Sequence, residues 1–236
     1  MNIQNDENYW PVPAEELRNI PEGEPFICMF SGGKDCGLAL SVALDKGKLF
    51  EIVHCLHKET EKSIWHSQSR QIVEKQAVEI KKNVNFSYSS VWYHRTKYIH
   101  MLMDYAKKGV KSVVFGDLFE EKQAKLEVAL CKCAGLIPRM PLWQIPEETL
   151  IQEVQKRKIK SIITLIRSPK IPLEWLGKQF DEEAYKYFIK LGIDPFGENG
   201  EFHTSLVGAD YFEKDLSYSL GEVVRDPEGM KIELLF

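Results

Sequence analysis

Through the first 136 residues, short apolar runs alternate with longer stretches in which apolar residues recur at helical spacing. Four apolar runs predict strands, at 26–30, 51–56, 84–92 and 111–115. The stretches between and after them predict helices, at 35–46, 69–81, 97–108 and 119–134. Regular alternation of this kind predicts an α/β fold, a doubly wound parallel sheet with helices on both faces.

The pattern changes after residue 136. Residues 137–143 read Ile-Pro-Arg-Met-Pro-Leu-Trp, which predicts a proline-rich connector. Beyond it the sequence predicts helical segments at 147–157, 173–176 and 181–191, and strands at 161–166, 206–207, 218–224 and 231–236. We therefore expect three parts, namely an N-terminal arm at 1–24, a first domain at 25–136 and a smaller C-terminal α+β domain at 137–236.

Residues 31–36, Ser-Gly-Gly-Lys-Asp-Cys, join the first predicted strand to the first predicted helix. Paired glycines adopt positive φ without steric cost and leave backbone N–H groups open. The N-terminus of a helix favours an anion, and Lys34 adds a positive charge. The turn predicts a phosphate-binding loop, with a turn of small residues capping a core helix as the plain alternative.

The carboxyl ends of parallel strands lie at one edge of a sheet, and ligands bind there. The turn at Ser31, the polar loop that begins at His57 and the Gly116-Asp117 turn each follow a predicted strand. We therefore expect these three segments to lie close together.

Composition and charge narrow the functional classes. The 236 residues include 35 Asp and Glu against 31 Lys and Arg, a net charge of -4, so general nucleic-acid binding is not expected. No run of eighteen apolar residues predicts a membrane span, and the first residues lack the signal-peptide pattern, so the expected location is cytoplasmic. The five cysteines are typical of isolated thiols, and Cys131 and Cys133 lack the second ligand pair of a zinc site.

The loop at 31–36 follows neither of two common nucleotide-binding patterns. Cys28 stands where Walker A has its first glycine, and Asp35 follows Lys34, while the glycines do not fit Gly-x-Gly-x-x-Gly. The loop resembles instead the PP-loop, Ser-Gly-Gly-x-Asp-Ser/Thr, of ATP pyrophosphatases, which cleave ATP between the α and β phosphates. Five of the six positions match. Cys36 departs, with a thiol where the family has a hydroxyl, and a thiol donates the weaker hydrogen bond.

A second polar cluster lies at 194–204, Asp-Pro-Phe-Gly-Glu-Asn-Gly-Glu-Phe-His-Thr. Its composition alone fits a surface loop as well as a site. The part from Gly197 to Thr204 resembles the C-terminal signature of the diphthine–ammonia ligase family of PP-loop proteins, and is most similar to the bacterial-type branch. Three further stretches agree in order, His66 with the helix reaching 76–77, residues 114–117 and residues 141–143. The resemblance covers roughly residues 26–207.

The resemblance implies an ATP-dependent ligase that adenylates a carboxylate, releases pyrophosphate and forms an amide with ammonia. It implies ATP and Mg²⁺ as cofactors, an ATP-binding domain at 25–136 and a substrate-binding domain at 137–236. The phosphates would be held by Ser31, Gly32, Gly33, Lys34, Asp35 and Cys36, with Asp35 also binding Mg²⁺. The acceptor and ammonia would be held by Asp117, Glu198, Asn199, Gly200, Glu201, His203 and Thr204. Lys34, Asp35 and Glu201 would be catalytic, and the acceptor is a small molecule or a protein side chain.

Plain structural roles stay open for several of these residues. Lys34 also fits the role of a solvated surface lysine, and Asp35 that of an acidic residue in the first turn of a helix. Asp117 also fits the role of a helix cap. His66 fits a polar loop residue, and Trp143 a packing residue of the connector. Two departures from the family lie at 123–125, where it usually carries arginine, and at 208–210, where it tends to read Asp-Gly-Pro. The choice of acceptor is therefore the property that transfers least.

Two other functions stay open. A PP-loop enzyme that modifies tRNA would want a basic surface and usually catalytic cysteines, and the acidic balance argues against it. A sensor that holds ATP or AMP without turnover is compatible with the Cys36 substitution. For the assembly we expect a homodimer, since small α/β enzymes often pair as symmetric dimers.

Overall fold

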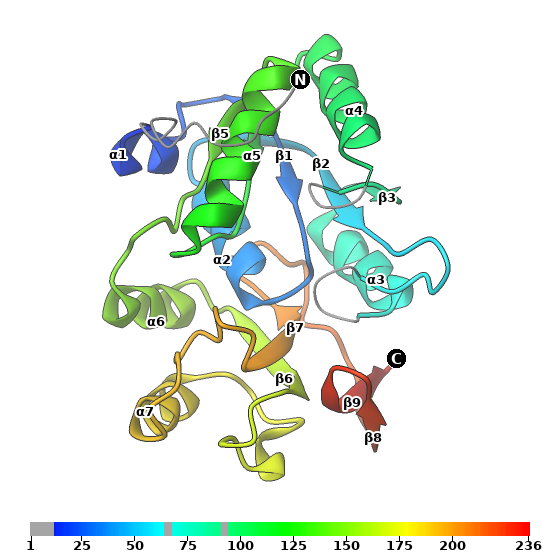
Figure 1. Cartoon of the computed structure of the whole chain (residues 1–236), viewed down its shortest axis with the longest axis vertical. Coiled ribbons are helices and arrows are strands. Elements are labelled where there is room, and N and C mark those ends of the chain that lie inside the picture. The colour runs from blue at the N-terminus through cyan, green and yellow to red at the C-terminus, as the bar shows by residue number, and fades with distance from the viewer. Residues whose placement is uncertain (1–11, 64–67, 91–93) are drawn as a thin grey trace.

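The computed structural model describes residues 12–63, 68–90 and 94–236 (Figure 1). These residues contain a five-stranded parallel sheet with the strand order β3-β2-β1-β4-β5. Its strands are β1 (Pro25–Met29), β2 (Lys48–Cys55), β3 (Val84–Ser87), β4 (Ser112–Val114) and β5 (Ile137–Arg139). Every neighbouring pair is parallel, so the predicted parallel sheet is confirmed.

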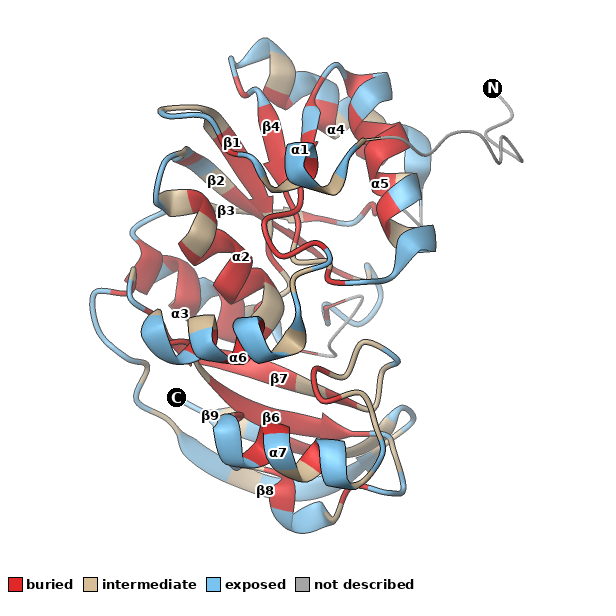
Figure 2. Ribbon diagram, turned by 90° about the vertical axis from the view of Figure 1, so that its left-hand side faces the viewer, coloured by how far each residue is buried: buried red, intermediate tan, exposed pale blue. Residues whose placement is uncertain are grey.

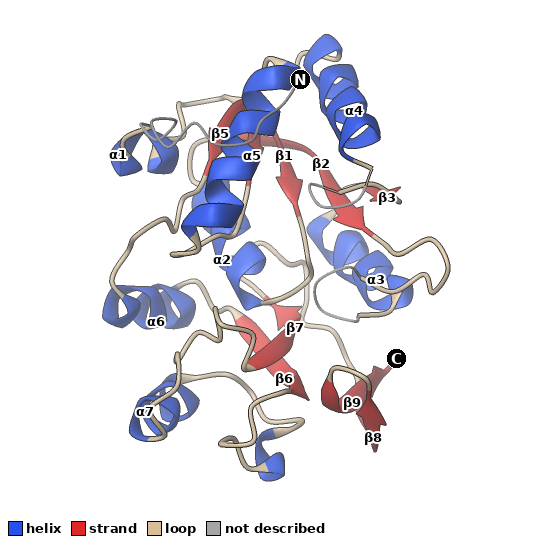
Figure 3. Ribbon diagram, in the orientation of Figure 1, coloured by secondary structure: helices blue, strands red, loops and turns tan. Residues whose placement is uncertain are grey.

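Helices cover both faces of this sheet, because residues of each strand alternate between two cores. Phe26 and Cys28 of β1 pack in the core on one face, with α2 (Lys34–Leu44) and α3 (Arg70–Ile80). Ile27 between them packs in the other core. That second core is covered by α1 (Ala14–Arg18), α4 (Arg95–Lys107) and α5 (Glu121–Ala134). The predicted doubly wound arrangement is confirmed (Figure 3).

A second, antiparallel sheet lies beyond α2 and has the order β7-β6-β9-β8. Its strands are β6 (Lys160–Ile166), β7 (Phe202–Gly208), β8 (Ser219–Asp226) and β9 (Gly229–Leu235). The accompanying helical segments are α6 (Glu147–Lys156), the 3-10 turn η1 (Leu173–Trp175) and α7 (Glu182–Lys190). Figure 2 shows buried strands in both sheets and exposed outer faces on α6 and α7. The predicted C-terminal α+β part is therefore present.

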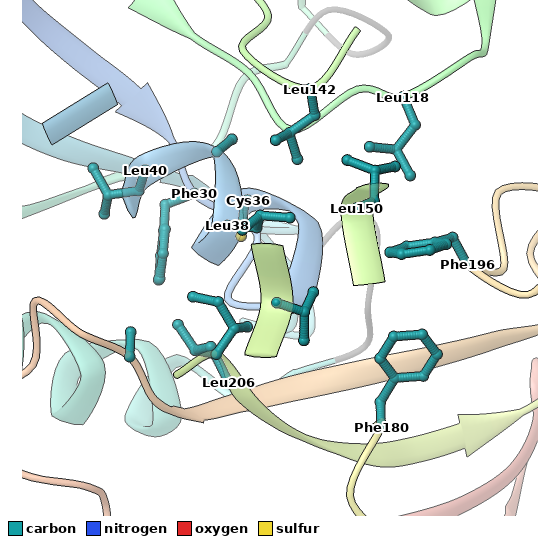
Figure 4. Packing of buried hydrophobic residues seen from close by; sticks show 14 of the residues in the cluster. Phe30, Cys36, Leu38, Leu40, Leu118, Leu142, Leu150, Phe180, Phe196 and Leu206 are labelled. Carbon is teal, nitrogen blue, oxygen red and sulfur yellow. The ribbon is translucent and has the colours of Figure 1, made fainter. Parts of the chain in front are cut away.

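The two sheets share one continuous core. Leu206 of β7 packs with Leu38 of α2, and the same cluster reaches Phe180 and Phe196 (Figure 4). The Leu206 N–H donates to the Gly32 carbonyl at 2.8 Å. A Cβ at Gly37 would lie 2.9 Å from the Leu206 side chain, so glycine permits this approach of β7 to α2. The antiparallel sheet is thereby fixed against the loop at 31–36.

Two expectations about element boundaries are wrong. Residues 137–139, predicted to begin a connector, form β5 and pair with β4, so the parallel sheet extends beyond residue 136. The prolines suggested a connector, but β5 is an edge strand, where a proline is tolerated. β7 begins at Phe202, so residues 202–204 are strand, not loop. Among the described residues, no helix has both the length and the apolar character needed to cross a membrane.

Candidate active site

A cavity of about 720 Å³ lies where the carboxyl ends of β1, β2 and β4 face the loop that precedes β7. Ser31, Ser63 of the loop after β2, and the Gly116-Asp117 turn all line it. The sequence-based expectation that these three segments meet is confirmed. Residues from the 194–204 cluster also line the cavity, including Glu198, His203 and Thr204. The two motifs therefore share one cavity.

The N–H groups of the loop at 31–36 are held by side chains. Gly32 N–H donates to the Cys36 sulfur at 3.2 Å, and Gly33 N–H donates to the Ser31 hydroxyl at 3.4 Å. Lys34 N–H, at the first residue of α2, donates to the Thr204 hydroxyl at 3.0 Å. Buried donors need partners, so the loop satisfies its own amides. The Gly32 bond has a weak sulfur acceptor and the Gly33 bond is long, so these two are the ones that a phosphate oxygen would replace most readily.

Cys36 organises this loop from inside it. Its thiol donates to the Gly33 carbonyl at 3.2 Å and accepts from the Ser31 hydroxyl at 3.1 Å. Burial, the largest effect, raises the pKa of the Cys36 thiol above its usual value of 9.0. The side chain is therefore a neutral thiol near pH 7, which does not suit nucleophilic chemistry.

Two glutamines behind the loop hold it in place. The Gln76 amide donates to the carbonyl of Gly32 at 3.0 Å and to that of Leu206 at 2.8 Å. The Gln68 amide donates to the Thr204 carbonyl at 2.8 Å. Gly32 has φ +85°, and a Cβ there would lie 2.6 Å from the Gln68 oxygen, so glycine is required. Sequence reasoning gave neither glutamine a role, although residues 76–77 lie in a stretch that carries the family resemblance.

The Lys34 ammonium group is buried and surrounded by aromatic rings, so the plain reading of a solvated lysine is wrong. Its Nζ lies 5.3 to 5.4 Å from the ring centroids of Phe180, Phe196 and Phe202. It donates to the Asp35 carboxylate at 2.8 Å and to the Phe196 carbonyl. The residue is only 4% exposed. Lys34 thus joins the loop at 31–36 to the loop at 194–204.

Four carboxyl groups that line the cavity have pKa values above their usual range, and burial is the largest cause for each. The pKa of Glu198 is raised to about 8, with the charge of Asp35 as the next contribution. The pKa of Asp117 is raised to about 6, and that of Asp35 is raised as well. Glu127 of α5 shares a hydrogen bond with Asp117, which adds to the effect of burial in raising the pKa of Glu127. Burial therefore favours the protonated, neutral forms of these carboxyl groups.

Four predicted site residues do not line the cavity, namely Gly32, Gly33, Asn199 and Glu201. Glu201 accepts hydrogen bonds from the Asp194 N–H and the Asn199 side chain, both at 3.3 Å, and so ties the loop together. Asn199 is engaged in the same contact. Glu198 and Gly200 of the same loop do line the cavity. Glu198 therefore reaches the cavity, whereas Glu201 does not.

His203 lies in the cavity wall beside Arg167, a residue that sequence reasoning missed. Burial, then the charges of Arg167 and Lys34, lowers the pKa of His203 to about 3, so this imidazole is neutral at pH 7. Arg167 also lines the cavity and forms an ion pair with Glu228 at 2.7 Å. The Arg167 guanidinium group therefore lies in the cavity wall and already pairs with one carboxylate.

His54 of β2 is a second residue that sequence reasoning missed. Its Nδ1 lies 2.6 Å from the Phe30 carbonyl, and burial lowers its pKa to about 4. The neutral ring therefore donates from Nδ1 and keeps an acceptor at Nε2, which is buried without a partner among the described residues. His66, which the family resemblance also singled out, lies outside the described residues.

Asp35 is the residue that fits Mg²⁺. Its Oδ1 atom is buried and has no hydrogen-bond partner among the described residues, and the residue lines the cavity. Mg²⁺ commonly takes one or two carboxylates together with phosphate oxygens. Within the described part of the chain, no group of three or more His, Cys, Asp or Glu side chains forms a metal site by itself.

The strand order and the glycine-rich loop between β1 and α2, opening into a cavity at the strand ends, define a Rossmann-like α/β protein of the PP-loop class. A family model described as the diphthamide synthase N-terminal domain matches residues 25–138. This segment of the chain is similar to that family.

Named relatives agree with the family. A diphthine–ammonia ligase from Bos taurus is 30% identical over 122 residues, which cover 50% of this chain and 46% of the bovine protein. The Homo sapiens protein of the same name is 29% identical over the same length. The chain thus spans about half the length of the curated relatives it matches. A solved structure described as a predicted subunit of a tRNA methyltransferase from Methanocaldococcus jannaschii covers 81% of this chain and is itself covered completely, at 14% identity and a TM-score of 0.43.

Proposed function

We propose that this chain uses ATP to convert a carboxylate into an amide with ammonia. The supporting observation is the single cavity onto which the PP-loop, Asp117, Glu198 and His203 all open. The family match and the name of the relatives, diphthine–ammonia ligase, support the same reaction class. In the first step, an acceptor carboxylate oxygen attacks the α-phosphorus of ATP, the bond to the β-phosphate oxygen breaks and pyrophosphate leaves. In the second step, ammonia attacks the acyl carbon and AMP leaves.

The PP-loop is suited to the phosphates. Its amides stand at the N-terminus of α2, where the helix dipole favours an anion. The β and γ phosphates would replace the weak bonds that Gly32 and Gly33 now make to Cys36 and Ser31. Lys34 would neutralise phosphate charge. Asp35 would hold Mg²⁺, which when bound would offset the negative charge of the phosphates.

Cavity residues outside the PP-loop would handle the acceptor and the protons. Arg167 already pairs with a carboxylate, that of Glu228, so it suits the acceptor carboxylate. Forming an amide from ammonium releases two protons. Asp117 and Glu198 are partly buried carboxyls of the cavity, and the positive charge of an ammonium ion beside them would favour the ionised forms that accept these protons. We assign to Glu198 the part that the family resemblance gave to Glu201, because Glu198 lines the cavity. The catalytic role of Glu201 stays a prediction.

The product mixture from ATP tests the proposal. The protein is incubated with ATP labelled at the α-phosphate, Mg²⁺, ammonium and a panel of carboxylic acids, with hydroxylamine as a second nucleophile to trap acyl-adenylates. We expect AMP and pyrophosphate, and a loss of at least about 100-fold in AMP formation for Asp35→Asn. Asp45→Asn, at the other end of α2 and outside the cavity, is the matched control. ADP and phosphate as products, or full activity in Asp35→Asn, would refute the proposal.

A nucleotide sensor is the second candidate. The observation in its favour is that the loop amides and the Lys34 ammonium are all engaged within the protein. Such a protein would bind ATP or AMP at the same cavity and release no pyrophosphate with any acid of the panel. Tight AMP binding without turnover would favour this candidate over the ligase.

A further inference from the structure

The surroundings of the Lys34 ammonium group amount to a binding site for an ammonium ion. Three ring faces, those of Phe180, Phe196 and Phe202, lie within 5.4 Å of Nζ, within the range of cation–π attraction. The Phe196 carbonyl and the Asp35 carboxylate accept its hydrogens. We call these four residues the aromatic cage. A primary ammonium group and a free ammonium ion have the same charge and the same kind of N–H donor.

The cage opens onto the cavity. Phe196 and Phe202 line the cavity together with Asp35 and Glu198. Phe180 contacts the same ammonium group but does not line the cavity. A cation in the cage therefore lies beside the space that the acceptor and the phosphates would fill. The charge of Lys34 favours the ionised forms of the neighbouring Asp35 and Glu198 carboxyls, so these carboxylates in turn favour a positive charge there.

We propose that the aromatic cage is the subsite for the ammonium co-substrate, and that Lys34 occupies it until a bound nucleotide draws this side chain to its phosphates. The inference rests on the proposed function and locates its nitrogen donor. When Lys34 leaves, the Asp35 carboxylate and the Phe196 carbonyl lose their cation, and an ammonium ion replaces both the charge and the donors. The ammonium ion then lies beside Glu198, one of the carboxyls proposed to take its protons.

The first experiment is a chemical rescue of the full-length chain. Lys34→Ala empties the cage, and the melting temperature of the variant is measured against ammonium chloride, with sodium chloride at equal ionic strength as the reference. We expect a saturable stabilisation by ammonium that sodium does not give. In Lys34→Ala combined with Phe180→Leu, the half-saturating ammonium concentration should rise about three- to tenfold, because one ring face is lost. Equal effects of sodium and ammonium would overturn the proposal.

The second experiment uses the unmodified Lys34 and keeps the test independent of how the alanine variant folds. Ammonium binding is measured by calorimetry with and without Mg²⁺ and a non-hydrolysable ATP analogue. We expect ammonium to bind only in the presence of the analogue. Phe180→Leu should weaken ammonium binding about three- to tenfold, while the analogue binds at least as tightly as before, because Lys34 leaves a weaker cage more easily. A purely structural role of Phe180 would weaken both, and that result refutes the cage.

These measurements separate the inference from the function on which it rests. Ammonium binding that depends on Phe180, in a protein that releases no pyrophosphate with any acid, would leave the cage standing and remove the ligase proposal. If the protein forms AMP but its ammonium binding does not depend on Phe180, the proposal of the aromatic cage is refuted and the ligase proposal stands.

Discussion

Replacing Glu198 by glutamine removes a half-buried carboxyl group whose ionisation the cavity disfavours. The pKa of this group rises from its usual 4.5 to about 8, first through burial and then through the charge of Asp35. Between these two pH values the folded chain holds a proton that the unfolded chain has released. The free energy of unfolding therefore falls as the pH rises through this window.

The size of the effect follows from the width of the window. Each pH unit corresponds to about 1.4 kcal/mol for one proton, so the full interval sets an upper limit of ~5 kcal/mol on what the ionised Glu198 costs the fold above pH 8. Rearrangement of the glycine-containing loop around the carboxylate reduces this amount. We expect Glu198→Gln to be more stable than the unmodified chain by about 2 to 4 kcal/mol at pH 8.5, and by about 1 kcal/mol at pH 5.5.

Urea denaturation at these two pH values, followed by circular dichroism, measures the difference. Glu22→Gln, at an exposed glutamate, reports the effect of removing a surface carboxylate. Glu198→Gln should stabilise the protein while lowering amide formation, because residues that activity requires often destabilise the fold. A Glu198→Gln variant with the same stability difference at pH 5.5 and pH 8.5, or one that is less stable at pH 8.5, would refute the reasoning about burial.

Substitutions at two further positions, Thr204 and Cys36, test how the PP-loop is held. Thr204→Val leaves the buried Lys34 N–H without its acceptor, so we expect a loss of about 1 to 3 kcal/mol in urea denaturation and weaker binding of an ATP analogue. Thr204→Ser should restore both, and identical behaviour of the two variants would contradict this role of the hydroxyl. Cys36→Ser preserves a donor and an acceptor at the same place, so AMP formation should persist, whereas Cys36→Ala should lose about 1 kcal/mol of stability. Complete loss of AMP formation in Cys36→Ser would instead indicate thiol chemistry.

The motif at 31–36 could be identified from the sequence because its features lie next to one another in the chain. A strand, two glycines and a helix start are adjacent in the chain, and the helix N-terminus favours an anion wherever it is placed. The alternation of apolar strands and amphipathic helices likewise predicted the parallel sheet, and with it the edge at which Ser31 and Asp117 meet. β5 was missed because its proline pointed to a connector, and only pairing with β4 shows it to be an edge strand.

The PP-loop, the alternation of layers and the place of the cavity can be predicted from the amino-acid sequence, because they follow from patterns among neighbouring residues. Which side chains face that cavity depends on the folded arrangement of the whole chain. The cage around Lys34 draws its rings from residues 180, 196 and 202, which come together through folding. Glu198 faces the cavity and Glu201 does not, because glycines with positive φ at 197 and 200 turn the loop between them. Side-chain direction in such a loop depends on backbone angles and contacts that no periodic pattern encodes.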